Sequence, residues 1–316
     1  MDYVLNVFWL VLGFALLIKG ADLFVDGSSS VAKLLKIPAV IIGLTIVSIG
    51  TSLPEAAVSI SASIKGEYDL SIANVVGSNI FNLLGVVGVS AFICPFVVDR
   101  VIMKRDFPIS ILAAGILAIM LIDNTLSTLE SAILFILFVG YLLMLVRSAL
   151  KNRAEQSIDE YKTLSPVKSI IFIVLGIAGI ILGGTLTVDA ATFFAKALNM
   201  SELLIGLTIV AVGTSLPELV TSIVAAKKGE SEIALGNVVG SNIFNIFFIL
   251  GMSGIVHPLN CDGGAFTDTI ILIVASGLMY GLYRIKNRVS RYLGILGVVI
   301  YAFYVVYIIL RAYSVI

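Results

Sequence analysis

Two glutamates in duplicated apolar segments are the residues of this chain whose type and spacing could bind ions. Residues 43–55 read GLTIVSIGTSLPE and residues 206–218 read GLTIVAVGTSLPE, identical at 11 of 13 positions. Of the twenty acidic residues, we place only Glu55 and Glu218 well inside apolar spans. A charge at mid-membrane costs at least ~2.5 kcal/mol on insertion scales, so such a residue is a functional candidate by default. Because no intramembrane Lys or Arg is placed to pair with either glutamate, the pattern favours ion binding over an internal ion pair.

Each glutamate follows a proline that should bend or break its helix. Pro54 lacks the N–H that would bond the carbonyl of Gly50, and its ring obstructs that carbonyl; Pro217 does the same to Gly213. A carbonyl freed at membrane depth needs a partner, and a cation can supply one. A simple kink would account for one such proline, but not for two that are each followed by Glu. The neighbouring hydroxyls that add oxygen atoms are those of Thr51, Ser52, Thr214 and Ser215.

A second motif, NVVGSNIFN, occurs at 74–82 and again at 237–245. Both duplicated motifs are separated from their copies by the same offset of 163 residues. Asn82 lies four residues after Ser78 and hence on the same helix face. We therefore expect it to be an ion ligand or to hold an ion ligand in place. Asn79 faces elsewhere, and we expect it to form hydrogen bonds between helices. The equivalent residues of the second copy are Asn245, Ser241 and Asn242.

The candidate ligands are all oxygen atoms: carboxylates, hydroxyls, amide oxygens and backbone carbonyls. Hard cations such as Ca²⁺ and Na⁺ prefer oxygen, whereas zinc or copper would require His or Cys. His257 is the only histidine, and Cys94 and Cys261 have no metal-like spacing. Two carboxylates balance one Ca²⁺ or two monovalent ions, so mutual exclusion at one site is a natural basis for exchange.

Composition places these segments in a membrane. The chain has 316 residues, of which 59% are hydrophobic and 13% charged, against about 25% charged in soluble domains. Its mean hydropathy is +1.11, and its net charge of zero suggests no nucleic-acid partner. Apolar runs of about 20 residues predict an all-α polytopic membrane protein, because they are too long for barrel strands. The ten predicted transmembrane spans are 3–24, 37–64, 70–98, 107–122, 126–146, 169–189, 202–226, 233–257, 268–283 and 292–312.

The distribution of basic residues predicts the orientation. Sixteen Lys and Arg residues fall on the side of the polar stretch 147–168, and three fall on the opposite side. The positive-inside rule therefore predicts a cytoplasmic linker and two extracytoplasmic termini. Five spans separate the start of one GLTIV segment from its copy, so the second copy enters the membrane from the opposite face. This predicts two inverted five-helix repeats, over 1–148 and 169–316, joined by a linker at 149–168, with broken second and seventh helices at the midplane.

The duplicated segments resemble the α-repeats of the cation/calcium exchanger superfamily, and most closely those of prokaryotic sodium/calcium exchangers with ten helices. The resemblance covers essentially the whole chain. It implies that Glu55 and Glu218 bind calcium together with the backbone carbonyls of Thr51 and Thr214. It also implies that the long, oblique first and sixth helices slide across a rigid remainder to alternate access. The implied sodium ligands are the same glutamates, Thr51, Ser52, Ser78, Thr214, Ser215, Ser241 and the backbone carbonyls of Ser48 and Ala211.

The predicted function is a secondary antiporter that moves Ca²⁺ against Na⁺ across a prokaryotic inner membrane by alternating access. Several relatives carry Asp at the position of Asn245, so the resemblance implies one titratable group fewer in this site. A Ca²⁺/H⁺ or K⁺-dependent exchanger on the same scaffold is the alternative. A channel is disfavoured by inverted repeats with broken helices, and an enzyme by the absence of G-x-S-x-G and H-E-x-x-H motifs. The expected partners are the two ions and the lipid bilayer, with no prosthetic group, and the expected unit is a monomer.

Overall fold

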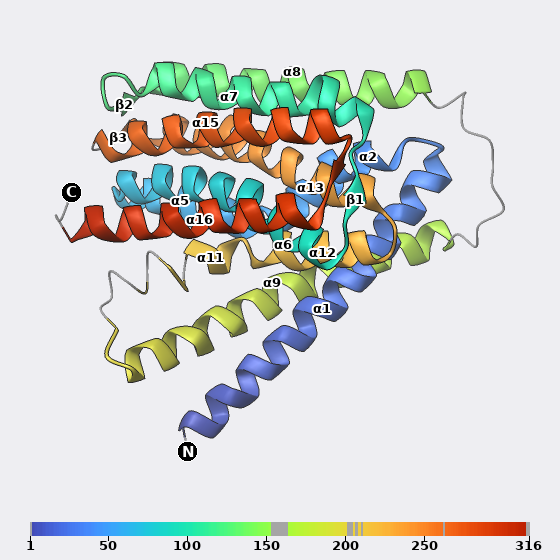
Figure 1. Cartoon of the computed structure of the whole chain (residues 1–316), viewed down its shortest axis with the longest axis horizontal. Coiled ribbons are helices and arrows are strands. Elements are labelled where there is room, and N and C mark those ends of the chain that lie inside the picture. The colour runs from blue at the N-terminus through green and yellow to red at the C-terminus, as the bar shows by residue number, and fades with distance from the viewer. Residues whose placement is uncertain are drawn as a thin grey trace.

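The protein is a bundle of helices that run between two ends of the molecule (Figure 1). The computed structural model describes residues 2–152, 164–200, 205, 208–209, 211–261 and 263–313. The C-terminal helix and the start of the first helix point toward one side of Figure 1, which we call the terminal end. Helix α8 (Thr128–Asn152) ends, and helix α9 (Pro166–Ala197) begins, at the opposite side, which we call the linker end.

Seven helices of the described chain are long and apolar enough to cross a membrane. Several contain a short π-helical segment (η) at which the helix continues without a break in direction. These helices are Asp2–Leu35 (α1), Tyr68–Phe81 with Asn82–Val86 and Val87–Ile93 (α5, η2, α6), Thr128–Asn152 (α8), Pro166–Ala197 (α9), Ser231–Phe244 with Asn245–Leu250 and Gly251–Val256 (α13, η5, α14), Gly263–Lys286 (α15) and Arg291–Ala312 (α16).

The second and seventh spans are broken where the prolines predict. The second bends by 50° at Ser52, and Ser215 interrupts the seventh at the equivalent place. Pro54 and Pro217 stand in the first turn after each break, where a missing N–H costs no hydrogen bond. The parts are Ala39–Ile42 (α2), Gly43–Val47 (η1), Ser48–Thr51 (α3) and Leu53–Lys65 (α4) in the second span, and Ala211–Thr214 (α11) and Leu216–Lys227 (α12) in the seventh.

The ten-helix prediction is confirmed in element order, with differences at the ends of spans. The fourth span is Ile102–Asp106 (η3) continued by Phe107–Met120 (α7), and part of the predicted start of the seventh lies outside the described residues. The first helix was predicted to end at residue 24 but continues to Leu35, because the polar run Ser28–Ser30 is buried against neighbouring helices. Helix α8 likewise continues to Asn152, so the polar linker begins later than predicted; most of that linker lies outside the described residues.

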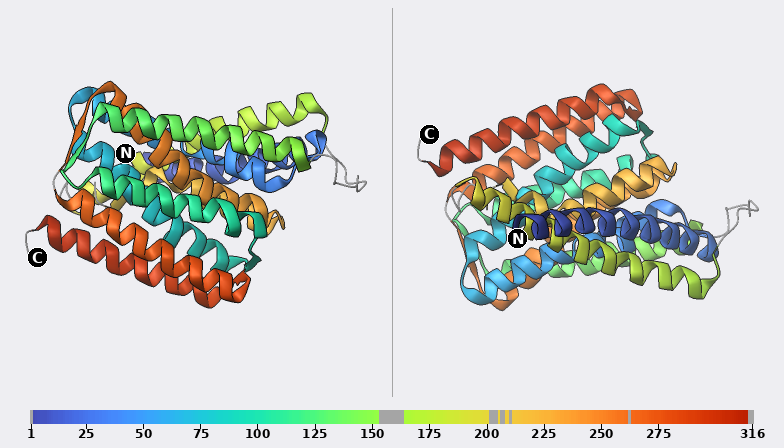
Figure 2. Two further views of the ribbon diagram at one scale, coloured as in Figure 1. Left: turned by 90° about the horizontal axis from the view of Figure 1, so that it is seen from above. Right: turned by 90° about the horizontal axis from the view of Figure 1, so that it is seen from below.

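Helices α1 and α9 lie obliquely across the other helices and pack against each other (Figure 1; Figure 2, right). Glycines bring the two backbones together: a Cβ on Gly183 would lie 2.6 Å from the carbonyl oxygen of Gly13. A Cβ on Gly20 would lie 2.9 Å from the carbonyl oxygen of Gly176. Small residues allow this approach between membrane helices. Because Gly13 and Gly20 are equivalent to Gly176 and Gly183 at the repeat offset, the contact itself has approximate two-fold symmetry.

Two short antiparallel ribbons tie the connections together at the two ends of the bundle. They join segments from the two repeats, so each ribbon links the repeats outside the helical region. Strand β1 (Phe96–Val97) pairs with β4 (Arg288–Val289), and β2 (Thr125–Leu126) pairs with β3 (Leu259–Asn260).

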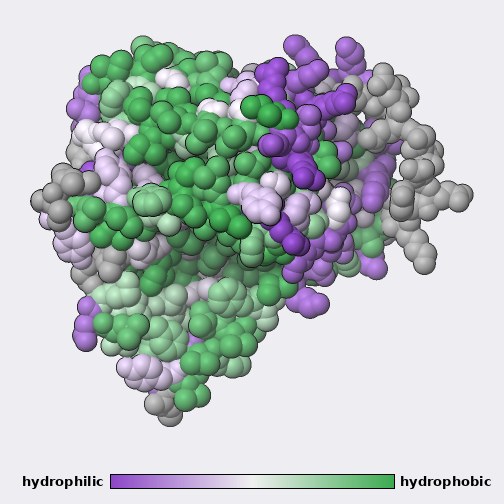
Figure 3. All heavy atoms as spheres, viewed as in Figure 1, coloured by the Kyte–Doolittle hydropathy of each residue, from purple (hydrophilic) through white to green (hydrophobic). Residues whose placement is uncertain are grey.

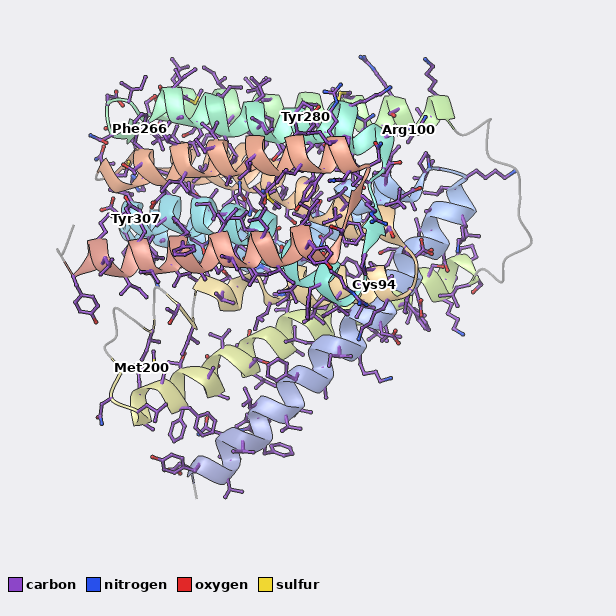
Figure 4. The ribbon with its side chains drawn as sticks, in the orientation of Figure 1. Cys94, Arg100, Met200, Phe266, Tyr280 and Tyr307 are labelled. Carbon is purple, nitrogen blue, oxygen red and sulfur yellow. The ribbon has the colours of Figure 1, made fainter. Side chains whose placement is uncertain are left out.

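The surface has the pattern of a membrane protein. Apolar side chains cover the middle of the visible face, and polar side chains gather toward the linker end (Figure 3). Arg100 lies near the linker end, whereas Phe266 and Tyr307 lie toward the terminal end (Figure 4). Many large apolar side chains of α1, α8, α9 and α16 are exposed, which suits contact with hydrocarbon rather than water.

Candidate cation-binding site

The two predicted glutamates meet at the centre of the bundle. Glu55 lies in the first turn of α4 and Glu218 in the first turn of α12, and both side chains are fully buried. Ser215 Oγ donates a hydrogen bond of 2.9 Å to Glu55 Oε1. Ser52 Oγ donates one of 2.7 Å to Glu218 Oε1. Each carboxylate is therefore held by the helix break of the opposite repeat, as well as standing at a helix N-terminus that favours negative charge.

Several buried oxygen atoms of the predicted set have no hydrogen-bond partner among the described residues. The second oxygen of each carboxylate, Glu55 Oε2 and Glu218 Oε2, is among them. Buried polar atoms nearly always have a hydrogen-bond partner. A buried polar atom without one costs about 1–3 kcal/mol of stability, and more if the group is charged. A bound cation would supply the missing interaction. The other partnerless oxygens in the predicted ligand set are Ser78 Oγ, Asn82 Oδ1 and Asn245 Oδ1.

The site fits a hard cation and no softer metal. Nowhere in the described ranges do three or more His, Cys, Asp or Glu side chains form a group that could hold a metal ion. Only two carboxylates are present, and every other candidate ligand is a neutral oxygen. Such a set suits Ca²⁺ or Na⁺, which accept hydroxyl, amide and carbonyl oxygen in flexible geometry.

Ser241, the serine of the second GSN motif, differs in its contacts from Ser78, the serine of the first. Ser241 Oγ lies 3.5 Å from Glu218 Oε1 and 3.4 Å from the carbonyl oxygen of Ser48, to which it donates. The structure thus brings Ser241 and the Ser48 carbonyl beside one carboxylate, as the predicted ligand set requires. Ser78, its equivalent, has no partner for its hydroxyl within the ranges that the structure describes.

The threonine hydroxyls are directed at other protein groups. Thr51 Oγ1 has one proton to donate, and its nearest acceptor is Asn237 Oδ1 at 3.0 Å, with the carbonyl oxygen of Val47 at 3.1 Å. Thr214 Oγ1 donates to the carbonyl of Ala211 at 3.3 Å. Both hydroxyls act as donors in this conformation, which uses their protons and leaves the lone pairs of each oxygen for an ion.

The middle asparagines form the interhelical hydrogen bonds that were predicted for them. Asn79 Nδ2 donates to the carbonyl of Asn242 at 3.1 Å, and Asn242 Nδ2 donates to the carbonyl of Asn79 at 3.1 Å. The last asparagines differ from each other. Asn245 Nδ2 donates to Asn79 Oδ1 at 3.0 Å, whereas neither polar atom of Asn82 has a partner in the part of the chain that the structure describes. Asn245 is therefore held in one orientation with its oxygen free, and Asn82 is not.

Two site residues were missed by reasoning from the sequence. Asn74 Nδ2 donates to the backbone carbonyl of Glu55 at 3.3 Å and to Ser59 Oγ at 2.9 Å. Asn237 repeats this arrangement at Glu218, with distances of 3.4 Å to the carbonyl and 3.1 Å to the Ser222 hydroxyl. A signal was available, because each lies four residues before the predicted GSN serine and shares its helix face.

Two further buried carboxylates have ordinary structural roles near the ends of spans. Asp106 in η3 accepts hydrogen bonds from Arg105 Nε at 2.9 Å and from the Tyr141 hydroxyl at 3.1 Å. Asp268 in α15 pairs with Arg311 at 2.7 Å. Each has an arginine as its countercharge, unlike Glu55 and Glu218, so neither needs an ion.

Two inverted repeats whose broken helices meet at a buried, oxygen-lined centre define a secondary transporter of cations. The family model described as sodium/calcium exchanger protein matches residues 5–147 and 168–310. This chain belongs to the sodium/calcium exchanger family.

This chain is similar to known proteins over nearly the full length of each. It is 35% identical to the sodium/calcium exchanger MaX1 of Methanosarcina acetivorans, over 98% of this chain and 99% of that protein. It is 39% identical to the putative antiporter CaxA of Alkalimonas amylolytica, over 91% and 94%. A solved structure of the sodium-calcium exchanger NCX_Mj superimposes with a TM-score of 0.84 at 34% identity, covering 96% of this chain and 99% of that one.

Proposed function

We propose that this protein is a secondary antiporter that exchanges Ca²⁺ for Na⁺ across a membrane by alternating access. The observation that carries the proposal is the pair of fully buried glutamates. Within the described part of the chain, each has one partnerless oxygen and no Lys or Arg among its hydrogen-bond partners. One Ca²⁺ or two Na⁺ would neutralise this pair, so one ion species displaces the other. The names of MaX1 and NCX_Mj support the same pair of ions.

The proposed calcium ligands are the carboxylates of Glu55 and Glu218 with the backbone carbonyls of Thr51 and Thr214. This ligand set is supported by the position of the four residues beside the two helix breaks, one between α3 and α4 and the other between α11 and α12. The hydroxyls of Ser52 and Ser215 donate hydrogen bonds to the carboxylates, which supports a role for both serines in binding sodium. The remaining proposed ligands are Ser78, Ser241, Asn82, Asn245 and the carbonyls of Ser48 and Ala211.

The proposed setting is the inner membrane of a prokaryotic cell, with the linker end in the cytoplasm and both termini outside. The polar side chains gathered toward the linker end support this orientation, together with the sixteen-to-three division of basic residues in the sequence (Figure 3). The proposed unit is a monomer, because the site is assembled from the two repeats of one chain.

The test is uptake of radiolabelled Ca²⁺ into proteoliposomes loaded in turn with Na⁺, K⁺ or protons. We expect uptake to follow an outward Na⁺ gradient. Uptake driven by the proton gradient alone, or Na⁺-driven uptake that requires K⁺ on the Ca²⁺ side to balance the cycle, would replace Na⁺ with the corresponding alternative. Trapped unlabelled Ca²⁺ should accelerate labelled uptake, which a carrier does and a channel does not.

A further inference from the structure

The two halves of the site are packed differently although their sequences repeat. A Cβ on Gly240 of α13 would lie 2.8 Å from Leu44 Cα and 2.8 Å from Ser48 Oγ. A Cβ on its repeat equivalent, Gly77 of α5, would meet no atom of the described residues within 4 Å. The half of the site toward the linker end is therefore closed by tight packing, and the half toward the terminal end is open at the described residues.

One turn away the same difference recurs. Gly236 is buried, and a Cβ there would lie 3.1 Å from the carbonyl oxygen of Val40. Its equivalent, Ala73, is exposed. Two consecutive turns of α13 thus pack closely against the second span. The equivalent turns of α5 do not pack in this way against the described part of the seventh span.

A hydrogen bond between a threonine of one repeat and an asparagine of the other lies inside the closed half. Thr51 Oγ1 donates to Asn237 Oδ1 at 3.0 Å, and both side chains are fully buried. The equivalent pair in the open half is not joined: Thr214 donates to the carbonyl of Ala211 in its own helix, and Asn74 is partly exposed. The bond is present where the packing is tight and absent where it is loose.

The amide nitrogen sets the direction of each asparagine in both halves. Asn237 Nδ2 donates to Glu218 and Ser222, which leaves its Oδ1 to face Thr51. Asn74 Nδ2 makes the same two bonds, to Glu55 and Ser59. Its Oδ1 is therefore oriented in advance to accept a hydrogen bond from the threonine of the other repeat, Thr214, once that helix approaches.

We propose that Asn74 and Asn237 are positioning residues for the exchange, each holding the backbone of its own glutamate and closing one half of the site through the threonine of the other repeat. In the conformation described, Asn237 and Thr51 close the linker half. In the opposite conformation Asn74 and Thr214 are joined, and the bond between Asn237 and Thr51 is broken. The proposal rests on the transport function proposed above, but its test uses conformation and not ion flux.

The test is side-specific labelling of one cysteine. In a background in which Cys94 and Cys261 are replaced by Ser, Ala73→Cys places a thiol in the open half, where a membrane-impermeant maleimide reaches it from the terminal end. Asn237→Ala removes the bond that closes the linker half, so it should favour the opposite conformation and slow labelling. A neutral hydrogen bond contributes enough to shift this equilibrium by about 2- to 10-fold. The matched variant Asn74→Ala should leave labelling unchanged or speed it.

A second variant separates closure from support of the glutamate backbone. Thr51→Val keeps the shape of the side chain and removes only the donor, so it should slow labelling as Asn237→Ala does. The double variant should slow it no further, because both changes remove one bond. Size-exclusion elution and thermal unfolding would check that each variant is folded.

Equal effects of Asn74→Ala and Asn237→Ala in the same direction would overturn the proposal, since a merely structural role would affect both repeats alike. Normal labelling in Thr51→Val would overturn it as well. Failure of Na⁺-driven Ca²⁺ uptake in the wild-type protein would instead count against the proposed function, and would leave the labelling results intact.

Discussion

Ser52 donates a hydrogen bond of 2.7 Å to Glu218, although 166 residues separate them in the chain. The reciprocal bond joins Ser215 to Glu55 at 2.9 Å. Each repeat therefore supplies a carboxylate to the site and a hydroxyl to the carboxylate of its partner. Neither repeat can complete the site alone, and a movement of one helix break relative to the other alters both carboxylates together.

Replacement of Glu55 or Glu218 by Gln should abolish Ca²⁺ transport in a protein that remains folded. The amide keeps the shape of the side chain and an oxygen for the serine bond, but it removes one of the two negative charges. Loss of one partner of a buried charge interaction costs about 3–5 kcal/mol, so Ca²⁺ affinity should fall more than about 100-fold. Calorimetric Ca²⁺ binding in detergent would measure this. The control is Glu67→Gln, an exposed acid immediately before α5; wild-type exchange by either site variant would exclude these ligands.

Ser52→Ala and Ser215→Ala should weaken ion binding by similar amounts. Each change removes the donor to one buried carboxylate, and a hydrogen bond to a charged group contributes about 1.5–3 kcal/mol. We therefore expect a rise of about 10-fold or more in the Na⁺ concentration that half-saturates Ca²⁺ efflux. Thr267→Val, which removes an exposed hydroxyl at the start of α15, should leave this value unchanged. An effect of only one serine variant would contradict the symmetric role of the two hydroxyls.

Asn245→Asp should preserve exchange at a pH where the new carboxyl keeps its proton, and should lose activity as the pH rises and that proton is lost. With a proton, the carboxyl is neutral like the amide and can donate to Asn79 Oδ1, as Asn245 does at 3.0 Å. Without a proton it adds a third negative charge and loses that bond. Asn82→Asp should change with pH in the same direction but retain more activity at alkaline pH, because Asn82 has no hydrogen bond to lose.

The measurement is the pH profile of Na⁺-driven Ca²⁺ flux for the wild-type protein and the two Asp variants. Loss of transport at every pH in both variants would mean that the amides are obligatory donors and not tolerant oxygen ligands. Identical profiles of the two variants would mean that the bond between Asn245 and Asn79 has no influence on transport.

Lys228→Met should destabilise the packing of α1 on the linker end of α12. Lys228 Nζ pairs with Asp22 at 2.7 Å and with Asp26 at 2.6 Å, both on α1. All three side chains are partly exposed, so each pair contributes about 0–1 kcal/mol and is screened by salt. We expect a fall in Tm of a few degrees at most, larger in low salt than in high salt. The repeat equivalent Lys65 forms no ion pair within the described residues, and Lys65→Met should not show this salt dependence.

The orientation is tested by a reporter fused after residue 316 that is active only in the cytoplasm. We expect no activity, because the distribution of basic residues predicts an extracytoplasmic C-terminus. The same reporter inserted between residues 152 and 164 should be active. Activity in the first fusion and none in the second would reverse the proposed topology.

Much of the fold could be predicted from the sequence because its causes are local. Apolar runs of membrane length predicted the ten spans, and Pro54 and Pro217 predicted the two breaks, since a missing N–H acts within one helical turn. The duplication at a constant offset predicted an inverted pair of repeats and the two equivalent glutamates at their meeting point. Span ends were less well predicted, because burial of Ser28–Ser30 against other helices keeps α1 helical beyond its apolar run.

Contacts between the repeats were decided only by tertiary structure. No pattern in the sequence assigns Ser52 to the distant glutamate, or Asn74 and Asn237 to the glutamate backbones, because these pairings depend on how the helices cross. The two halves repeat in sequence, whereas Gly240 is tightly packed and Gly77 has open space around it at the described residues. Two equivalent half-sites of a chain that alternates access are not open at the same time, so a conformation that is open to one side has to break the symmetry that the sequence carries.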